Sequence, residues 1–396
     1  MNKALLRSEI QEFIEVNLRT DLHQLILKKP VFEGVTNKEL AQQILGKLKS
    51  KEKLPTWFRL KNALFPPKIS IEQTSSEVTA QYKAGLISGK NIIDLTGGFG
   101  VDVYYFSQVF DSVVHCEMNR NLSEITASNF EKLGVTNCHY VQGDGMAYVK
   151  ENEVRYEWIY LDPSRRSEVK GKVFLLKDCL PNVPDNLELL FSKSTKVMMK
   201  TSPLVDISQG ISELSFVKEI HVVAVKNEVK ELIWVLEKGF EGDSRVLAVN
   251  LEKKGNQIFE FQLTEESESI CPLSPPLSFL YEPNSAILKS GSFNQVGIQN
   301  KVGKLHKHSH LYTHSELIDF PGRRFRIMEV IPFQGKEIKK RLGGKKANIT
   351  TRNFPKKVEE LRKTLKIKEG GEVYLFFTTN LEEEKICVVC TKVTGE

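Results

Sequence analysis

Three glycines follow a short apolar run in the segment NIIDLTGGFG, which covers residues 91–100. The run is short and rich in β-branched side chains, which is typical of a buried strand in a parallel sheet. Gly97, Gly98 and Gly100 let the backbone turn sharply and approach a ligand with no Cβ in the way. Residues 101–110 favour a helix, so the glycines lie between the carboxyl end of a strand and the N-terminus of a helix. Open α/β sheets bind nucleotides at this place.

A carboxylate stands at the spacing that a nucleotide site requires. Glu117 lies 20 residues beyond Gly97 and closes the next expected strand. At this spacing a carboxylate reaches the hydroxyl groups of a ribose, and the adjacent Met118 is assigned to the same pocket. A glycine-rich turn alone can serve chain geometry, but the two features together indicate a nucleotide-like cofactor.

The order of the glycines distinguishes between cofactors. A dinucleotide fingerprint needs a third glycine where this chain has Val103. The stretch instead resembles motif I of the class I S-adenosylmethionine-dependent methyltransferases, D-x-G-x-G-x-G. Asp94, Gly98 and Gly100 match that motif, and Thr96 replaces its first glycine. The resemblance implies S-adenosyl-L-methionine as the cofactor, bound by this loop.

The same resemblance places further residues around the cofactor. Gln73 and Thr74 belong to the segment before motif I, which often folds over the methionine end of the cofactor in that superfamily. Thr74, with Glu77 three residues later, is equally compatible with a simple helix N-cap. Asp144 would accept a hydrogen bond from the adenine amine, and Gly145 would leave room for the ring. A polar turn with Asp144 as a helix N-cap is the alternative.

A second motif ends the fourth expected strand. Asp162 and Pro163 resemble the start of motif IV, (D/N)-P-P-(Y/F), of amino-methylating enzymes. In those enzymes the acid and a backbone carbonyl orient a target amine for in-line displacement, a reaction that depends mainly on positioning. Asp162 is therefore expected to orient the acceptor beside the cofactor, with Pro163 rigidifying the carbonyl. Lys200 closes the fifth strand at the same edge, where it either holds a phosphate or simply ends the strand.

Two departures from motif IV bear on the substrate. Ser164 replaces the second proline, and Arg165 replaces the aromatic residue. Since arginine can stack on a base or bind a phosphate, Arg165 and Arg166 favour a nucleic acid; surface ion pairing is the alternative. Ser164 and Ser202 stand where enzymes of the family that methylate ring carbons carry a cysteine. This leaves nitrogen or oxygen acceptors.

The elements that must position these residues alternate between strand and helix. The expected strands cover residues 92–95, 113–117, 138–141, 157–161, 196–200, 220–225 and 232–236. The last two are so close in sequence that they must form an antiparallel hairpin. The predicted fold is an α/β, Rossmann-like, seven-stranded methyltransferase sheet with an antiparallel last strand. Residues 245–251 and 257–263 predict a further hairpin.

The C-terminal region is basic. Residues 321–373 carry 16 Lys and Arg against 6 Glu, a net +10, so the rest of the +6 chain is at −4. Such a surface favours polyanions. ANITTRNFP (residues 347–355), a basic helix and GGEVYLFFTT (residues 370–379) resemble the THUMP-like domain of a group of methyltransferases, and YEPNSAILKSG (residues 281–291) resembles its ferredoxin-like insert. THUMP domains are associated with structured RNA.

Helical periodicity and these resemblances together define four expected domains. Residues 1–70, with Thr36 and Glu39 as a capping box, are expected to form an N-terminal helical cap; a partner-binding or substrate-guiding role is the alternative. Residues 71–240 form the methyltransferase domain. Residues 241–317 hold the hairpin, a linker and the ferredoxin-like insert, and residues 318–396 form an α+β THUMP-like domain. The side chains of the last domain expected to bind substrate are Lys345, Lys346 and Arg352; a solvated basic face with no ligand is the alternative.

Composition narrows the remaining possibilities. No apolar window reaches the length of a membrane span and the first ten residues lack the core of a signal peptide, so a cytoplasmic protein is expected.

Cys387 and Cys390 have redox or zinc spacing, but no second pair accompanies them and buried thiols are expected. The four histidines of residues 306–314 lack interleaved carboxylates or cysteines. No metal site is therefore expected.

The sequence thus predicts a methyltransferase that uses S-adenosyl-L-methionine to methylate a nitrogen of structured RNA, such as tRNA or rRNA. Two other readings stay open at this point. One is a methyltransferase of a protein or small molecule whose basic tail serves assembly. The other is a non-catalytic RNA-binding protein that retains a degenerate cofactor fold.

Overall fold

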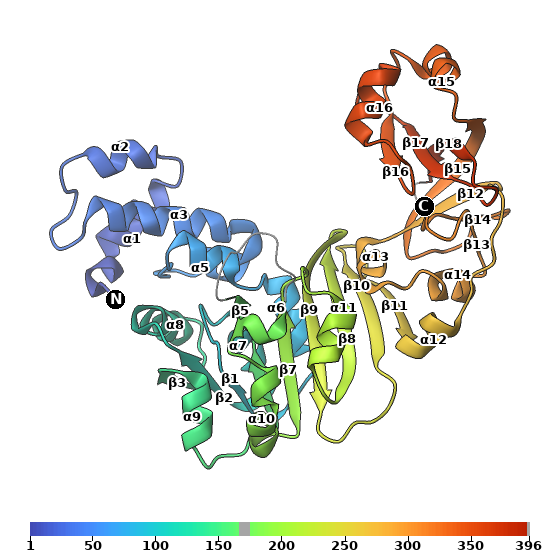
Figure 1. Cartoon of the computed structure of the whole chain (residues 1–396). Helices are drawn as coiled ribbons and strands as arrows, with labels where there is room; N and C mark the ends of the chain where they lie inside the picture. Colours follow the sequence, from blue (N-terminus) through green and yellow to red (C-terminus); the bar gives the residue numbers. More distant parts are fainter. Residues whose placement is uncertain (166–174, 394–396) are drawn as a thin grey trace. The chain divides into compact units, whose positions relative to one another are not determined.

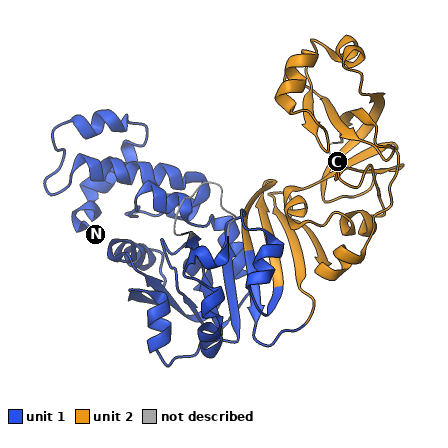
Figure 2. Ribbon diagram, in the orientation of Figure 1, with its two compact units in different colours: residues 1–218, 233–241 blue, residues 219–232, 242–396 orange. Residues whose placement is uncertain are grey.

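The computed structural model describes residues 1–165 and 175–393. The chain divides into two compact units (Figure 2). Unit 1 comprises residues 1–218 and 233–241, and unit 2 comprises residues 219–232 and 242–396. None of the helices in the described ranges is both long and apolar enough to span a bilayer.

A large mixed sheet is built from strands between residues 89 and 262 (Figure 1). Its strand order is β11-β10-β8-β9-β7-β4-β1-β2-β3. The strands are β1 (Gly89–Asp94), β2 (Phe110–Glu117), β3 (Cys138–Gln142), β4 (Trp158–Leu161), β7 (Lys196–Thr201), β8 (Val217–Val225), β9 (Glu228–Glu237), β10 (Arg245–Leu251) and β11 (Gln257–Gln262). All seven strands predicted from the sequence are present. The prediction of an α/β Rossmann-like sheet is confirmed.

The pairings explain which edge carries the site. β1 pairs in parallel with both β2 and β4, and β4 pairs in parallel with β7. The carboxyl ends of these strands therefore meet at one edge of the sheet. β8 and β9 are neighbours joined by only two residues, which fits the expected antiparallel hairpin. The predicted β10–β11 hairpin is also confirmed; β10 adds in parallel to β8 and so extends the sheet.

Helices connect these strands and precede them. In unit 1 they are η1 (Lys3–Leu6), α1 (Ser8–Val16), α2 (Leu22–Leu27), α3 (Asn37–Lys53), α4 (Pro55–Arg59), α5 (Lys68–Gln73), α6 (Glu77–Ala84), α7 (Val101–Phe106), α8 (Arg120–Lys132), α9 (Gly145–Glu151), η2 (Leu176–Asp178), η3 (Pro184–Asn186), α10 (Leu187–Lys193) and α11 (Ile207–Glu213). A short hairpin, β5 (Ser164–Arg165) with β6 (Cys179–Leu180), forms a separate small sheet.

Two helix boundaries differ from the prediction. The helix after the glycine loop ends at Phe106, because Phe110 already pairs with Gly89 in the sheet. Thr74 is not a helix N-cap: its N–H donates to the Ser70 carbonyl and closes α5. The Ser76 side chain caps α6 instead.

The N-terminal segment is helical, as predicted. The Thr36 hydroxyl and the Glu39 carboxylate form the expected capping box at the start of α3. Leu40 and Ile44, one turn apart on this helix, are fully buried. The division into four domains at residues 70, 240 and 317 stays a prediction.

Unit 2 contains a second sheet of order β13-β14-β12-β15-β18-β17-β16. Its elements are α12 (Leu263–Glu268), β12 (Phe279–Pro283), α13 (Ser285–Ser290), α14 (Gln295–Gln299), β13 (Gly303–Lys304), β14 (Tyr312–His314), β15 (Gly322–Pro332), α15 (Gly335–Leu342), β16 (Asn348–Thr351), α16 (Val358–Leu365), β17 (Val373–Thr379) and β18 (Lys385–Lys392). Ile338 of α15 and Leu361 of α16 pack in one core cluster with Leu375 and Phe377 of β17. Cys387 and Cys390 are buried free thiols, as expected.

Candidate functional site

The glycine loop has a backbone that side chains would obstruct. Gly98 and Gly100 have φ angles of 55° and 77°, a region that favours glycine. A Cβ on Gly97 would overlap the His115 ring and lie 2.9 Å from the Cys116 carbonyl oxygen. The buried His115 ring lies with Nε2 3.2 Å from the Gly98 carbonyl oxygen. Burial lowers the pKa of His115 to about 4, so this ring is neutral and supports the loop by packing and hydrogen bonding.

Thr96 connects the two predicted motifs. Its hydroxyl donates to the Asp94 carboxylate (3.1 Å) and accepts from the Asp162 backbone N–H (2.7 Å). The Thr96 backbone N–H also donates to Asp94, at 2.8 Å. Burial raises the pKa of the Asp94 carboxyl well above its usual value, partly opposed by these bonds from Thr96. The residue that replaces the first motif glycine therefore joins the loop after β1 to the loop after β4.

Replacing Thr96 by valine, which keeps the shape and removes the hydroxyl, is expected to lower the free energy of unfolding by about 1–3 kcal/mol. The reason is that the Asp162 N–H and one Asp94 contact lose their partner. Urea unfolding at neutral pH measures the change. Thr96→Ser, which keeps the hydroxyl, should stay within about 1 kcal/mol of the wild type. Equal losses in both variants would show that the hydroxyl is unimportant.

Glu117 faces the glycine loop. Its carboxylate accepts from the Gly98 backbone N–H at 2.9 Å and from the Asn119 N–H at 2.7 Å. The adjacent Met118 exposes 73% of its surface. The carboxylate is thus held at the loop by the backbone, at the carboxyl end of β2.

Asp144 and Gly145 follow β3. The Asp144 carboxylate accepts from the Met146 N–H at 2.8 Å and caps α9. This contact is the helix cap that the sequence offered as the alternative. A Cβ on Gly145 would lie 2.7 Å from the Leu95 Cα. Glycine is therefore required here to let α9 approach the end of β1, which is a packing reason that the sequence did not reveal.

Asp162 and Lys200 form an ion pair at the same edge. The Lys200 Nζ lies 2.5 Å from an Asp162 carboxylate oxygen, and the Asp162 side chain retains 32% exposure. Burial raises the pKa of Asp162, and the Lys200 ammonium opposes that rise without cancelling it. Pro163, next to Asp162, is buried. The sequence placed Asp162 and Lys200 at one edge, and the structure brings their charged groups into contact.

A buried network beneath this pair was not predicted. The fully buried Lys83 of α6 pairs with Asp102 of α7 at 3.0 Å and donates to the Ser75 hydroxyl at 2.9 Å. Asp102 also accepts from the hydroxyls of Ser75 (2.8 Å) and Tyr160 (2.9 Å). Burial alone would raise the pKa of Asp102, but Lys83 and Lys200 bring it below its usual value. The only sequence signal was a polar residue in the first turn after the glycines.

Other predicted residues are placed as follows. Gln73 ends α5 and Thr74 caps its C-terminus. Arg165 lies in β5, and Arg166 falls outside the described residues. In unit 2, Lys345 and Lys346 are exposed. Arg352 instead donates to the buried Glu282 carboxylate at 2.9 Å, so its guanidinium has a structural partner.

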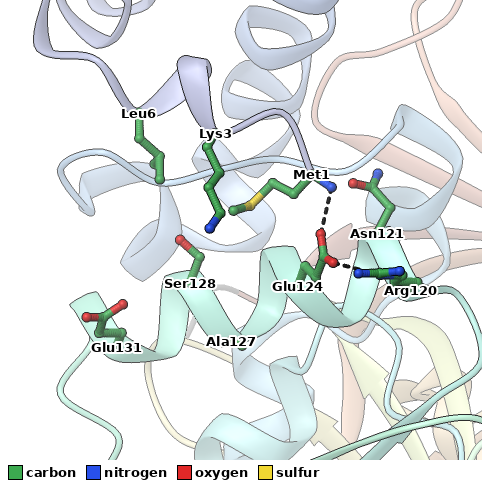
Figure 3. Close-up of a pocket in the computed structure, with 9 residues that line it drawn as sticks. All are labelled: Met1, Lys3, Leu6, Arg120, Asn121, Glu124, Ala127, Ser128 and Glu131. Carbon is green, nitrogen blue, oxygen red and sulfur yellow. Dashed lines mark hydrogen bonds and ion pairs between the residues drawn. The ribbon is translucent and has the colours of Figure 1, made fainter.

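An open cavity of about 1000 Å³ lies between η1 and α8 (Figure 3). The Met1 amino group donates to Glu124 at its wall, and Arg120 pairs with the same carboxylate. None of the predicted cofactor or acceptor residues lines it. Among the described residues, no group of side chains has the composition of a metal site.

Two family models match unit 2. A model of a ferredoxin-like domain matches residues 279–321, and a model described as THUMP domain-like matches residues 322–392. No curated protein matches the sequence significantly.

The comparisons with solved structures include a match over the whole chain. The crystal structure of a "putative methyltransferase" from Porphyromonas gingivalis W83 is 28% identical, covers 100% of both chains and has a TM-score of 0.89. An rRNA methylase from Streptococcus thermophilus is 12% identical over 40% of this chain and 93% of that chain, with a TM-score of 0.30. TrmK from M. capricolum, in complex with S-adenosylhomocysteine, is 14% identical over 41% of this chain and 68% of that chain, with a TM-score of 0.31.

Proposed function

We propose that this chain transfers a methyl group from S-adenosyl-L-methionine to a nitrogen of structured RNA. Its matches to a ferredoxin-like and a THUMP-like domain, and its similarity over the whole chain to a "putative methyltransferase", support the proposal. The observation that carries the proposal is the junction of two loops through Thr96. The Thr96 hydroxyl holds the glycine loop and the Asp162 loop together at the carboxyl edge of β1 and β4. A cofactor bound at the glycine loop would therefore lie beside a methyl acceptor held by the Asp162 loop.

The cofactor half of the proposal rests on the shape of the loop. Gly97 and Gly100 leave no room for a Cβ, and Glu117 is held beside Gly98. In the proposal, Glu117 binds the ribose hydroxyls and Asp144 accepts from the adenine amine. Its capping bond to Met146 occupies one oxygen, and a carboxylate has acceptor capacity for more. The bound cofactor would supply an electrophilic methyl group on its sulfur atom.

The acceptor half rests on Asp162. Its partly exposed carboxylate is anchored by Lys200 on one oxygen and carries acceptor capacity for a target amine. Holding the amine in line with the methyl group needs no strong base, because positioning and water exclusion supply most of the rate. Lys200 in this role keeps Asp162 ionised and oriented. We also propose that the Asp162 side chain contacts the bound cofactor.

RNA is proposed as the substrate because of the basic THUMP-like module. Lys345 and Lys346 are exposed and belong to the segment of net charge +10. Lysine ammonium groups at a surface bind phosphate in a salt-dependent way. Arg352 is assigned a smaller part, because its guanidinium already pairs with the Glu282 carboxylate.

Calorimetric titration with S-adenosylmethionine, S-adenosylhomocysteine and NAD tests the cofactor. We expect micromolar binding of the first two and none of NAD, with at least tenfold weaker binding in Glu117→Ala. The reason is that the loss of the carboxylate removes a charge-assisted hydrogen bond to the ribose and the support of the Gly98 N–H. Unchanged binding in Glu117→Ala would contradict the assignment of this residue.

Methyl incorporation from labelled cofactor into RNA pools then tests the substrate. RNA that accepts methyl groups, and that binds more weakly as salt rises, would support the proposal. Methyl transfer to protein or small-molecule pools alone would refute the RNA assignment. Tight RNA binding with no turnover in any pool would indicate the non-catalytic alternative.

A further inference from the structure

The histidine-rich segment of residues 306–314 has a structural member. His306 is buried, and its Nε2 lies 2.8 Å from the Glu383 carboxylate. Its Nδ1 accepts from the His308 backbone N–H (3.1 Å) and lies 2.9 Å from the Asn353 amide. Because Nδ1 accepts, Nε2 carries the proton. Both ring nitrogens are thus used within the protein, and His306 fixes the loop that presents the following residues.

A cavity of about 460 Å³ opens beside this loop, within unit 2. The rings of His310 and Phe293 stack at its wall, with centroids 3.6 Å apart and planes 21° apart. Burial, together with the positive charges of Lys304 and Arg352, lowers the pKa of His310 to about 4. The His310 ring is therefore neutral at pH 7, and its buried Nδ1 has no hydrogen-bond partner within the described residues.

Lys304 is the central cation of the cavity. It is only 4% exposed, and its Nζ lies 5.6 Å from the centroid of the Phe293 ring. Within residues 1–165 and 175–393, no carboxylate lies within ion-pair distance of this ammonium group. Burial lowers the pKa of Lys304, and Cys271 and the more distant Glu266 carboxylate oppose that shift without cancelling it. The cost of burying such a group is high unless a ligand pairs with it.

The one carboxylate that lines the cavity is already occupied. Glu266 accepts from the backbone N–H groups of Phe293, Asn294 and Gln295, at 2.8–3.1 Å. Two further basic residues, Lys307 and His308, are exposed at the cavity. The cavity therefore presents positive charge and hydrogen-bond donors to whatever enters it.

Apolar side chains form another part of the lining. Ile270 and Leu273 expose 88% and 49% of their surfaces. A volume of this order accommodates a group larger than an inorganic ion, with one charged end and one apolar or aromatic face. A nucleotide has this combination: a phosphate for the lysines and a base that packs on apolar surface.

We propose that this cavity binds the phosphate group of a nucleotide, with Lys304 as the buried cation, Lys307 as the second cation, and Ile270 and Leu273 beside the base. The same phosphate chemistry is offered by a free mononucleotide and by the backbone of RNA. The inference stands independently of methyl transfer, because every residue that carries it belongs to unit 2.

Titration of the full chain with uridine 5′-monophosphate, uridine and an RNA hairpin tests the proposal. Lys304→Met, which keeps the length of the buried stem, is expected to weaken phosphate-dependent binding at least tenfold. Lys307→Ala, at an exposed position, provides a second variant whose folding is not at risk and should weaken binding in the same direction. Lys301→Met is the matched control, because Lys301 is exposed and does not line the cavity. It should leave binding within about twofold, as expected for a surface charge.

The outcomes separate the two sources of phosphate. Sensitivity of the mononucleotide to Lys304→Met identifies a free nucleotide as ligand, and sensitivity of the hairpin alone identifies an RNA phosphodiester. Binding of both ligands that is unchanged in Lys304→Met, or uridine that binds as tightly as its monophosphate, would overturn the proposal. Glu117→Ala should leave this binding intact. Loss of mononucleotide binding in that variant alone would place the ligand in the glycine-loop site and also refute the cavity.

Discussion

Replacing Asp162 by alanine is expected to lower the rate of methyl transfer roughly 10²–10³-fold and to leave cofactor affinity within about threefold. The carboxylate is the group at this edge that is both anchored, by Lys200, and partly exposed. Its loss removes the contact that would orient the acceptor, while the Asp162 backbone N–H still donates to Thr96. Single-turnover methylation and calorimetry measure the two quantities separately. A variant that transfers methyl groups at the wild-type rate would refute the role of Asp162.

The pH dependence of the rate provides an independent check. Burial raises the pKa of Asp162, so protonation, which removes its acceptor function, begins at a higher pH than for an exposed aspartate. Activity should therefore fall as pH decreases through that raised pKa. Lys200→Met should move this acid limb to higher pH, because the ammonium that opposes the rise is gone. Asp162→Asn, which keeps an acceptor oxygen and does not titrate, should lose the acid limb.

Gly100→Ala is expected to weaken cofactor binding roughly 100-fold, because it combines two costs of about 1–3 kcal/mol each. Gly100 has a φ of 77°, and an added Cβ would lie 2.5 Å from Thr126 Cγ2 and 3.0 Å from the Phe130 ring. The loop must shift to relieve these contacts, and the Gly98 N–H moves away from Glu117. Calorimetric titration and urea unfolding measure both effects.

Gly134→Ala is the matched control for this change. Gly134 has nearly the same φ, 75°, but nothing lies within 4 Å of an added Cβ. This variant isolates the backbone cost, so it should lose about 1–2 kcal/mol of stability and retain cofactor affinity. If both variants bound cofactor equally well, the close packing of the glycine loop would have no part in binding.

The sheet could be predicted because its strands are short apolar runs bounded by polar turns. The hairpin of β8 and β9 was predicted from a connection too short for a crossover. The end of α7 could not be predicted in this way. Val109 and Phe110 continue an apolar helical pattern. Phe110 belongs to β2 because it pairs with Gly89, which is distant in sequence. At α6, two neighbouring serines and Thr74 could all cap a helix, and local sequence did not distinguish them.

The candidate site was predictable where one side chain acts next to its own strand end. Asp94, Glu117 and Asp162 all follow that rule. The network of Lys83, Ser75 and Asp102 was not predictable, since its members come from α6, the turn before it and α7. Their proximity depends on how two helices pack, which a pattern along the chain does not encode. Arg352 was assigned to substrate for a similar reason: its partner Glu282 is 70 residues away.

The hydroxyl of Thr96 makes the two loops thermodynamically linked. It donates to the acid of one loop and accepts from the backbone of the other, so a ligand that orders either loop lowers the entropy that the second ligand must still lose. Such coupling is reciprocal: the factor by which cofactor tightens acceptor binding equals the factor by which acceptor tightens cofactor binding. Measuring the affinity for each ligand with and without the other, in the wild type and in Thr96→Val, would give the part of this coupling free energy that the hydroxyl carries. Positive coupling would favour the state in which cofactor and substrate are bound together.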